Sequence, residues 1–170
     1  MENNYICRQA TIDEIIKKWN YEVELHKDNL FYPFARKEFI EEAIKGTRIT
    51  YIGLLNNEII CDITVILKEE GILSESQQKI DIVSNERCFL CALRTNKEYE
   101  NKGYFSKLYK YVENELKEKG YKELSLSVDV SETRNLMIYF HWNYTNFIRT
   151  EIIHGKDKTY TFNYYYKKIS

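Results

Sequence analysis

The chain has 170 residues, of which 44% are hydrophobic and 30% are charged, and its formal net charge is −1. This length and composition are typical of one globular domain over residues 1–170 and exclude a fibrous or disordered protein. Because acidic and basic residues are mixed along the whole chain, we expect no nucleic-acid partner. No apolar run approaches the ~20 residues of a membrane span, and the polar start at Met1 lacks the features of a secretion signal. We therefore expect no membrane partner and a cytoplasmic location.

Hydrophobic periodicity and turn residues predict secondary-structure elements in the order β-α-α-β-β-β-α-β-α-β-β. The expected strands are residues 5–10, 48–55, 58–68, 87–95, 123–130, 146–153 and 158–168, and the expected helices are residues 11–27, 35–45, 103–119 and 132–142. This order requires a mixed sheet, so the predicted fold class is α/β (α+β).

Short signals set the boundaries of the first elements. Thr11 and Glu14 have the spacing of a capping box at the start of the first helix. The segment Phe31–Pro33 is expected to interrupt the helical pattern, and Gly46 to end the second helix. Asn56-Asn57, which tolerates positive φ, predicts a tight hairpin turn between the flanking strands.

Three later segments complete the predicted organisation. Residues 69–86 are polar and long for a hairpin connection, so we expect an irregular insertion. Residues 123–130 alternate Leu and Val with Ser and Asp, which is the period of a strand with one apolar face. Residues 154–157 predict a turn, with His154 exposed in a loop.

The cysteines lie in apolar, strand-like stretches: Cys7, Cys61, Cys88 and Cys91. Free cysteine commonly behaves as a small buried hydrophobic residue, so we interpret them as reduced core residues. Cys88 and Cys91 match the CxxC spacing of redox and zinc sites. In a strand, however, residues three apart point to opposite faces, and no second cysteine pair or nearby histidine completes a metal site. A thiol redox or zinc protein is therefore the least favoured hypothesis.

The most informative segment for function is a strand, a polar turn, a glycine and a helix over residues 93–108. The N-terminus of a helix offers unpaired N–H groups and the positive end of the macrodipole, which together bind phosphate or pyrophosphate. Lys102 and Lys107 add positive charge beside Gly103. Because many helices begin after Gly and Lys without binding a ligand, this signal alone is weak.

Residues 93–108, followed by residues 124–144, resemble the acetyl-CoA motif of the GNAT N-acetyltransferase superfamily. The family pattern is a strand, Arg/Gln-x-x-Gly-x-Gly/Ala opening a helix, an apolar strand, and a short helix with a tyrosine a few residues before Gly-Phe. The matching segments here are Glu100-Asn-Lys-Gly103-Tyr-Phe105, Leu124-Ser-Leu-Ser-Val128 and Asn135-Leu-Met-Ile-Tyr139-Phe-His-Trp-Asn143-Tyr144. The sequence departs from the pattern at Glu100, Phe105 and Asn143-Tyr144.

The resemblance implies a GNAT-type mixed central sheet flanked by helices, with acetyl-CoA as co-substrate between splayed central strands and no metal. Strand-edge backbone groups would contact the pantetheine arm, and one N–H there would stabilise the oxyanion: Leu93, Arg94 and Thr95. The turn and helix start would hold the pyrophosphate: Lys102, Gly103, Tyr104, Phe105 and Ser106. Tyr139 would be the catalytic general acid that protonates the departing CoA thiolate.

No general base for the acceptor ammonium is evident in the sequence. Asp62 and Asp129 are candidates, although each is first interpreted as structural or solvated. His26, on the apolar face of the first helix, is interpreted as structural. His141 follows Tyr139 by two positions and should point away from it, so we interpret it as a packing or surface residue.

These observations predict an N-acetyltransferase that transfers an acetyl group from acetyl-CoA directly to an amine in a ternary complex. The acceptor, a small-molecule or peptide amine, would be met by residues 24–36, by the 69–86 insertion and by the aromatic last strand with Tyr160, Phe162 and Tyr164. The departures at Glu100 and Phe105 leave a second hypothesis, a non-catalytic acyl-CoA-binding or sensor module with a degenerate GNAT fold. Family habit and the aromatic last strand are compatible with a homodimer.

Overall fold

A computed structural model of the whole chain describes residues 4–67, 81–154 and 159–170. The strands form a seven-stranded sheet in the order β1-β2-β3-β4-β5-β7-β6. In chain order the elements are β1 (Tyr5–Gln9), α1 (Ile12–Leu25), α2 (Phe31–Lys45), β2 (Arg48–Leu55), β3 (Glu58–Ile66), β4 (Arg87–Thr95), the 3₁₀-helix η3 (Lys97–Tyr99), α3 (Tyr104–Glu118), β5 (Glu123–Asp129), α4 (Thr133–His141), β6 (Asn146–His154) and β7 (Thr159–Lys168). Since β4 and β5 pair in parallel and β5 and β7 pair antiparallel, the predicted mixed α/β fold is confirmed.

The chain divides into two compact units, and β4 contributes to both. The first unit comprises Met1–Val65 and Ala92–Glu115, and the second comprises Ile66–Cys91 and Leu116–Ser170. The prediction that residues 1–170 form a single domain stays a prediction.

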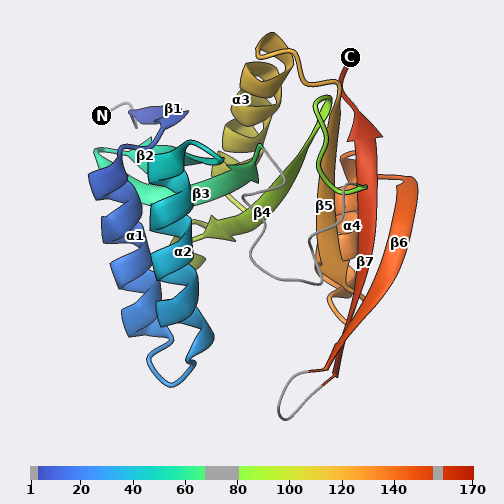
Figure 1. Cartoon of the computed structure of the whole chain (residues 1–170). Coiled ribbons are helices and arrows are strands. Elements are labelled where there is room, and N and C mark those ends of the chain that lie inside the picture. Colours follow the sequence, from blue (N-terminus) through green and yellow to red (C-terminus); the bar gives the residue numbers. More distant parts are fainter. Residues whose placement is uncertain (1–3, 68–80, 155–158) are drawn as a thin grey trace. The chain divides into compact units, whose positions relative to one another are not determined.

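The first unit contains the N-terminal strands and the two long N-terminal helices. β1 pairs antiparallel with β2, from Tyr5 opposite Leu55 to Gln9 opposite Tyr51. α1 and α2 lie side by side (Figure 1), and the rings of Trp19 and Phe39 meet between them at a centroid distance of 4.4 Å. Most residues of β2 and β3 are buried, so these strands form the core onto which the rest of the unit packs.

Two predicted local signals of the first unit are confirmed. The Thr11 hydroxyl accepts a hydrogen bond from the Glu14 N–H and the Glu14 carboxylate accepts one from the Thr11 N–H, which completes the capping box. Asn56 and Asn57 have φ of 50° and 68°, and they form the tight turn between β2 and β3. Such left-handed pairs match the twist of a two-residue hairpin, which explains why asparagine occupies both positions.

The start of α2 differs from the prediction. Phe31–Pro33 does not interrupt the helical pattern, because α2 begins at Phe31. Proline lacks an N–H, but the first turn of a helix leaves its N–H groups without helical partners anyway, so Pro33 costs nothing there. Gly46 ends the helix with φ of 74°, as predicted, and its N–H donates to the carbonyls of Ala43 and Glu42.

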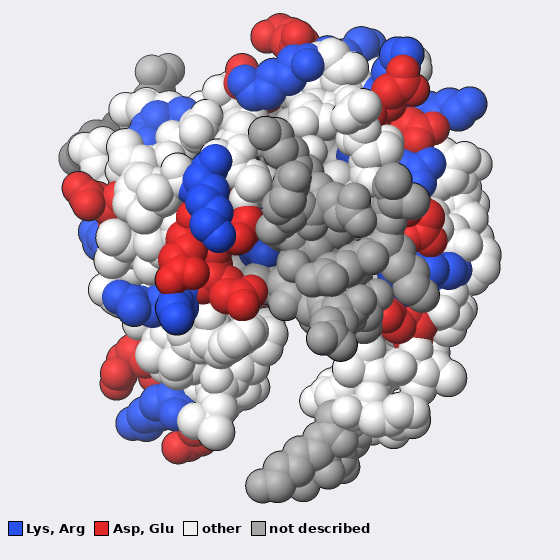
Figure 2. Space-filling view, in the orientation of Figure 1, with Lys and Arg blue, Asp and Glu red and all other residues white. Residues whose placement is uncertain are grey.

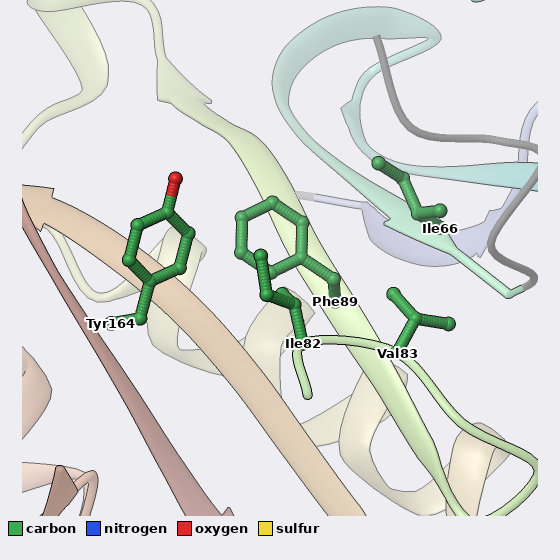
Figure 3. Close-up of a cluster of buried hydrophobic side chains, with 5 residues drawn as sticks. All are labelled: Ile66, Ile82, Val83, Phe89 and Tyr164. Carbon is green, nitrogen blue, oxygen red and sulfur yellow. The ribbon is translucent and has the colours of Figure 1, made fainter. Parts of the chain in front are cut away.

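The second unit is built around β5, β7 and β6. β5 pairs antiparallel with β7 along its whole length, and β6 pairs with β7 with a register shift between Phe147 and Arg149. A core cluster of Ile66, Ile82, Val83, Phe89 and Tyr164 brings the last two side chains together at a ring distance of 6.2 Å (Figure 3). This cluster joins the last residue of β3 and the segment before β4 to β4 and β7.

The predicted apolar face of β5 is confirmed, because Leu124, Leu126 and Val128 are buried. Ser125, which alternates with them, is also fully buried, and its hydroxyl donates to the Ile82 carbonyl at 2.6 Å.

Two boundary predictions in or near this unit need correction. His154 is the last residue of β6, where its Nδ1 lies 3.3 Å from the Thr159 hydroxyl, although it is exposed as predicted. β3 ends at Ile66 rather than at residue 68. Most of the predicted 69–86 insertion and the predicted turn at 155–157 lie outside the described residues.

The surface carries charges of both signs. Figure 2 shows Lys and Arg side chains interspersed with Asp and Glu on the face in view. None of the helices described is long and apolar enough to cross a membrane.

Candidate active site

The predicted phosphate-binding turn lies in the first unit between η3 and α3. Asn101 has φ of 59° and Gly103 has φ of 80°, and α3 begins directly afterwards at Tyr104. A Cβ built on Gly103 would meet no atom within 4 Å, so glycine is favoured here by its left-handed conformation rather than by lack of space. Alternating backbone conformations of this kind turn successive N–H groups toward one side, where they can bind an anion.

The start of α3 fits a pyrophosphate. The first hydrogen bond of the helix runs from the Lys107 N–H to the Gly103 carbonyl, at 3.2 Å. The N–H groups before Lys107 therefore have no hydrogen-bond partner within the helix. Lys102 and Lys107 are exposed, and their Nζ atoms lie 5.5 and 5.9 Å from the ring centroids of Tyr99 and Tyr5. Glu100 is exposed as well. The turn and the first turn of α3 therefore carry two exposed cations, Lys102 and Lys107, and one exposed anion, Glu100.

Tyr5 anchors this helix start to the N-terminal strands, a role that the sequence did not indicate. Its hydroxyl donates to the Tyr104 carbonyl at 2.8 Å and lies 3.3 Å from Cys61 Sγ. Burial, reinforced by the neighbouring thiols, raises the pKa of Tyr5 well above its ordinary value, so the phenol stays a donor. Gly53 makes room for this contact, because a Cβ there would come within 2.2 Å of the Tyr5 hydroxyl.

The second half of β4 carries the residues expected to contact the pantetheine arm. Leu93, Arg94 and Thr95 are half-buried. They follow Ala92, whose φ of 49° is unusual for a residue with a side chain and marks a local distortion of the strand. The parallel register of β4 with β5 covers Arg87–Phe89 opposite Glu123–Ser125.

Arg94 also belongs to a buried cluster of charged side chains. It donates from Nη2 to Asp62 Oδ2 at 2.7 Å and from Nε to the same oxygen at 3.1 Å. Lys18 Nζ lies 3.6 Å from the other Asp62 oxygen and donates to Asn96 Oδ1 at 3.0 Å. Because Asp62 is fully buried and held by two cations, it is poorly placed to serve as the general base.

Glu22 extends this cluster along α1 toward His26. One Glu22 oxygen lies 3.1 Å from Lys18 Nζ, and the other lies 3.9 Å from Arg94 Nη1 and 3.8 Å from His26 Nε2. The His26 ring stacks on Tyr32 at a centroid distance of 4.1 Å. Lys18 and Glu22 were not singled out from the sequence. Lys18, Glu22 and His26 follow one another at intervals of four residues, and this spacing would have placed them on one helical face.

Tyr139 lies in the second unit, on α4. It is half-buried, and its ring centroid lies 6.2 Å from that of Trp142 and 6.3 Å from that of Tyr144. Burial, with a smaller contribution from the charge of Glu132, raises the pKa of Tyr139 to about 12. The phenol is therefore protonated at neutral pH, as a proton donor requires.

The second unit also contains the remaining candidates. Asp129 Oδ1 accepts hydrogen bonds from the Ser131 N–H at 2.8 Å and hydroxyl at 2.6 Å, so it organises the turn before α4. His141 is exposed at the end of that helix. Cys88 is buried, and Cys91 packs against the cluster around Phe89. Among the residues that the structure describes, no group of three or more His, Cys, Asp or Glu side chains is placed to hold a metal.

Residues 14–141 match the model of the acetyltransferase (GNAT) family. The chain belongs to this family. GNAT proteins are acetyltransferases that use acetyl-CoA, so the resemblance of residues 93–108 and 124–144 is confirmed at the family level. A comparison with curated protein sequences gives no significant match.

Solved structures of GNAT proteins share the fold over nearly the whole chain. The N-acetyltransferase from Staphylococcus aureus Mu50 superposes with a TM-score of 0.69 at 15% identity, covering 98% of this chain and 99% of its own. The ribosomal-protein-S18-alanine N-acetyltransferase from Escherichia coli gives 0.67 at 13%, covering 98% and 95%. YncA from Salmonella typhimurium, solved with its cofactor acetyl-CoA, gives 0.66 at 8%, covering 99% and 95%. These likenesses establish the GNAT fold.

Proposed function

We propose that this GNAT-family chain transfers an acetyl group from acetyl-CoA directly to an amine in a ternary complex. The observation that carries the proposal is the start of α3, where Asn101 and Gly103 are left-handed and the lysines at positions 102 and 107 are exposed. This arrangement has the chemistry that a pyrophosphate needs: N–H donors, the positive end of a helix dipole and nearby cations. Because the donors are main-chain groups, the departures at Glu100 and Phe105 leave them in place.

Each predicted site residue has a distinct role in this proposal. Acetyl-CoA supplies the activated acyl group. The pyrophosphate is held by Lys102, Gly103, Tyr104, Phe105 and Ser106, and the pantetheine arm lies along Leu93, Arg94 and Thr95. Tyr139 gives a proton to the leaving sulfur. Burial raises the pKa of this phenol, so it carries its proton at neutral pH, as the role needs.

The acceptor is proposed to be a small-molecule or peptide amine that approaches along α1 and α2. Several large apolar side chains are exposed near the end of α1 and the start of α2: Tyr21, Leu25, Leu30, Phe31 and Phe34. The cytoplasmic location and the homodimer stay predictions.

The proposal is tested by calorimetric titration of the purified protein with acetyl-CoA. Gly103→Ala should weaken binding several-fold, because a side chain strains the left-handed backbone by roughly 1 kcal/mol and shifts the turn. Gly46→Ala is the matched control. Gly46 has a similar φ of 74°, also with nothing within 4 Å of its Cβ position, but it lies at the end of α2.

Amine-dependent release of CoA thiol then separates turnover from binding alone. We expect the wild-type protein to release thiol faster with an amine than by hydrolysis. Tight binding without release for any amine would favour the non-catalytic sensor hypothesis, and absence of binding would reject both.

A further inference from the structure

The end of α1 places a histidine beside a buried carboxylate. Glu22 is nearly buried, whereas the side chain of His26, one turn later, is 40% exposed. Their closest atoms, Glu22 Oε2 and His26 Nε2, are 3.8 Å apart. A base for proton transfer needs this combination of a fixed internal partner and access to the substrate, and its hydrogen bonds often tighten only in the complex.

Two cations fix the position of the Glu22 carboxylate. Lys18 Nζ lies 3.1 Å from one of its oxygens, and Arg94 Nη1 lies 3.9 Å from the other. Both cations are in turn held by the fully buried Asp62. The side chain of Glu22 is thus tied through Arg94 to the strand segment that we propose to lie along the pantetheine arm.

The surroundings of His26 fix its ring. The ring stacks on Tyr32 at the end of α1, where His26 is the C-cap. The charged groups that face the pair are Lys18 on α1 and Arg94 on β4, and both are cations beside Glu22. Burial and the charge of Glu22 raise the pKa of Tyr32, and the charge of Arg94 opposes the rise. The Tyr32 hydroxyl therefore lies close enough to Glu22 and Arg94 to interact with both charges.

We propose that His26 is the base that accepts a proton from the acceptor ammonium, and that Glu22 is its positioning residue. This inference rests on the proposed acetyltransferase function. In this proposal Nε2 carries a hydrogen and faces Glu22, so Nδ1 is the nitrogen that accepts the proton. His26 is therefore not the purely structural residue that the sequence suggested.

The proton balance of the reaction is complete with this base. The acceptor nitrogen loses two protons as its lone pair forms the new bond to the acyl carbon. The first passes to His26 and then to water, and the second reaches the sulfur, which takes the electron pair of the broken C–S bond. Each turnover releases one proton to solution.

The pair itself is tested by NMR of the histidine rings in the full chain, with the His26 signals assigned from their loss in His26→Gln. In Glu22→Gln the ring signals of His26 should shift, because the carboxylate beside Nε2 becomes a neutral amide. Asp13→Asn removes one exposed charge from the same helix and should leave these signals unchanged. Unchanged His26 signals in Glu22→Gln would overturn the pairing.

The catalytic role is tested with an alanyl tripeptide, spermidine and tyramine as amine probes. We expect His26→Gln to bind acetyl-CoA like the wild type but to lose about 100-fold in kcat/KM near neutral pH, with a smaller loss at high pH, where free amine is abundant. Full activity and an unchanged pH profile in His26→Gln would overturn the base while the acetyltransferase function stands. No acetylation by the wild type would instead overturn the proposed function and, with it, the base.

Discussion

The start of α3 and the charge cluster around Arg94 lie in the same unit but are built on different principles. The start of α3 is an exposed main-chain site, set by the left-handed Gly103 and the helix that follows it. The cluster is a buried side-chain site, in which Lys18 and Glu22 of α1 meet Asp62 of β3 and Arg94 of β4. A main-chain site survives changes of side chain, whereas a side-chain cluster depends on every member.

Replacement of Asp62 should have the largest effect and tests the cluster directly. Asp62→Ala leaves Lys18 and Arg94 without their fully buried partner, so we expect the free energy of unfolding to fall by about 3–5 kcal/mol. Urea denaturation followed by circular dichroism measures the loss. The exposed Glu100→Ala is the control and should change stability by less than about 0.5 kcal/mol. Equal losses in the two variants would contradict the contrast between the sites.

Tyr139→Phe should have the next largest effect, and it affects rate rather than stability. Removal of a positioned proton donor typically costs about 100-fold in rate, so kcat should fall by that factor while acetyl-CoA binding is kept. The measurement is thiol release with the amine that the wild type uses best, beside a calorimetric titration. A variant with unchanged kcat would show that Tyr139 only packs against Trp142 and Tyr144.

Tyr5→Phe tests whether a side chain supports the main-chain site. The variant loses the bond from the Tyr5 hydroxyl to the Tyr104 carbonyl, which is worth about 1 kcal/mol, and should weaken acetyl-CoA binding up to about 5-fold. Calorimetry measures the affinity, and denaturation shows how much of the loss is general instability. Reduced stability with unchanged affinity would mean that the helix start holds its geometry without Tyr5.

The smallest expected effect concerns the ion pair of Arg8 with Glu14, at 2.6 Å. Arg8 is the main cause that lowers the pKa of Glu14 from 4.5 to about 2. A lowered folded pKa gives stability that is fully present above the unfolded value and is lost as pH falls toward the folded one. The stability difference between wild type and Arg8→Gln should therefore be constant above pH 4.5, below about 1 kcal/mol because the pair is partly exposed, and should shrink between pH 4.5 and 2. A difference that grows on acidification would contradict this assignment.

Local sequence predicted most of the fold and the main-chain part of the site. The capping box at Thr11, the hairpin turn at Asn56-Asn57 and the glycine before α3 each depend on a few neighbouring residues, so their structure follows from propensity alone. The start of α2 was misplaced because a proline such as Pro33 fits the first turn of a helix as well as it ends a helix.

The side-chain part of the site could not be predicted in the same way. The contacts of Glu22 with Arg94, and of Tyr5 with Tyr104, join residues far apart in the sequence. Their pairing depends on how α1, β1 and β4 pack, which a single sequence does not specify. The burial of Ser125 could not be predicted for the same reason, since its hydroxyl donates to the carbonyl of the distant Ile82.

The most direct measurement is an amide NMR titration of the full chain with acetyl-CoA. The account predicts that the largest shifts fall on the N–H groups of residues 103–106 and 93–95, because these would hold the pyrophosphate and the pantetheine arm. Saturable shifts confined to other residues, or no shifts at all, would contradict the placement of the acetyl-CoA site at the start of α3.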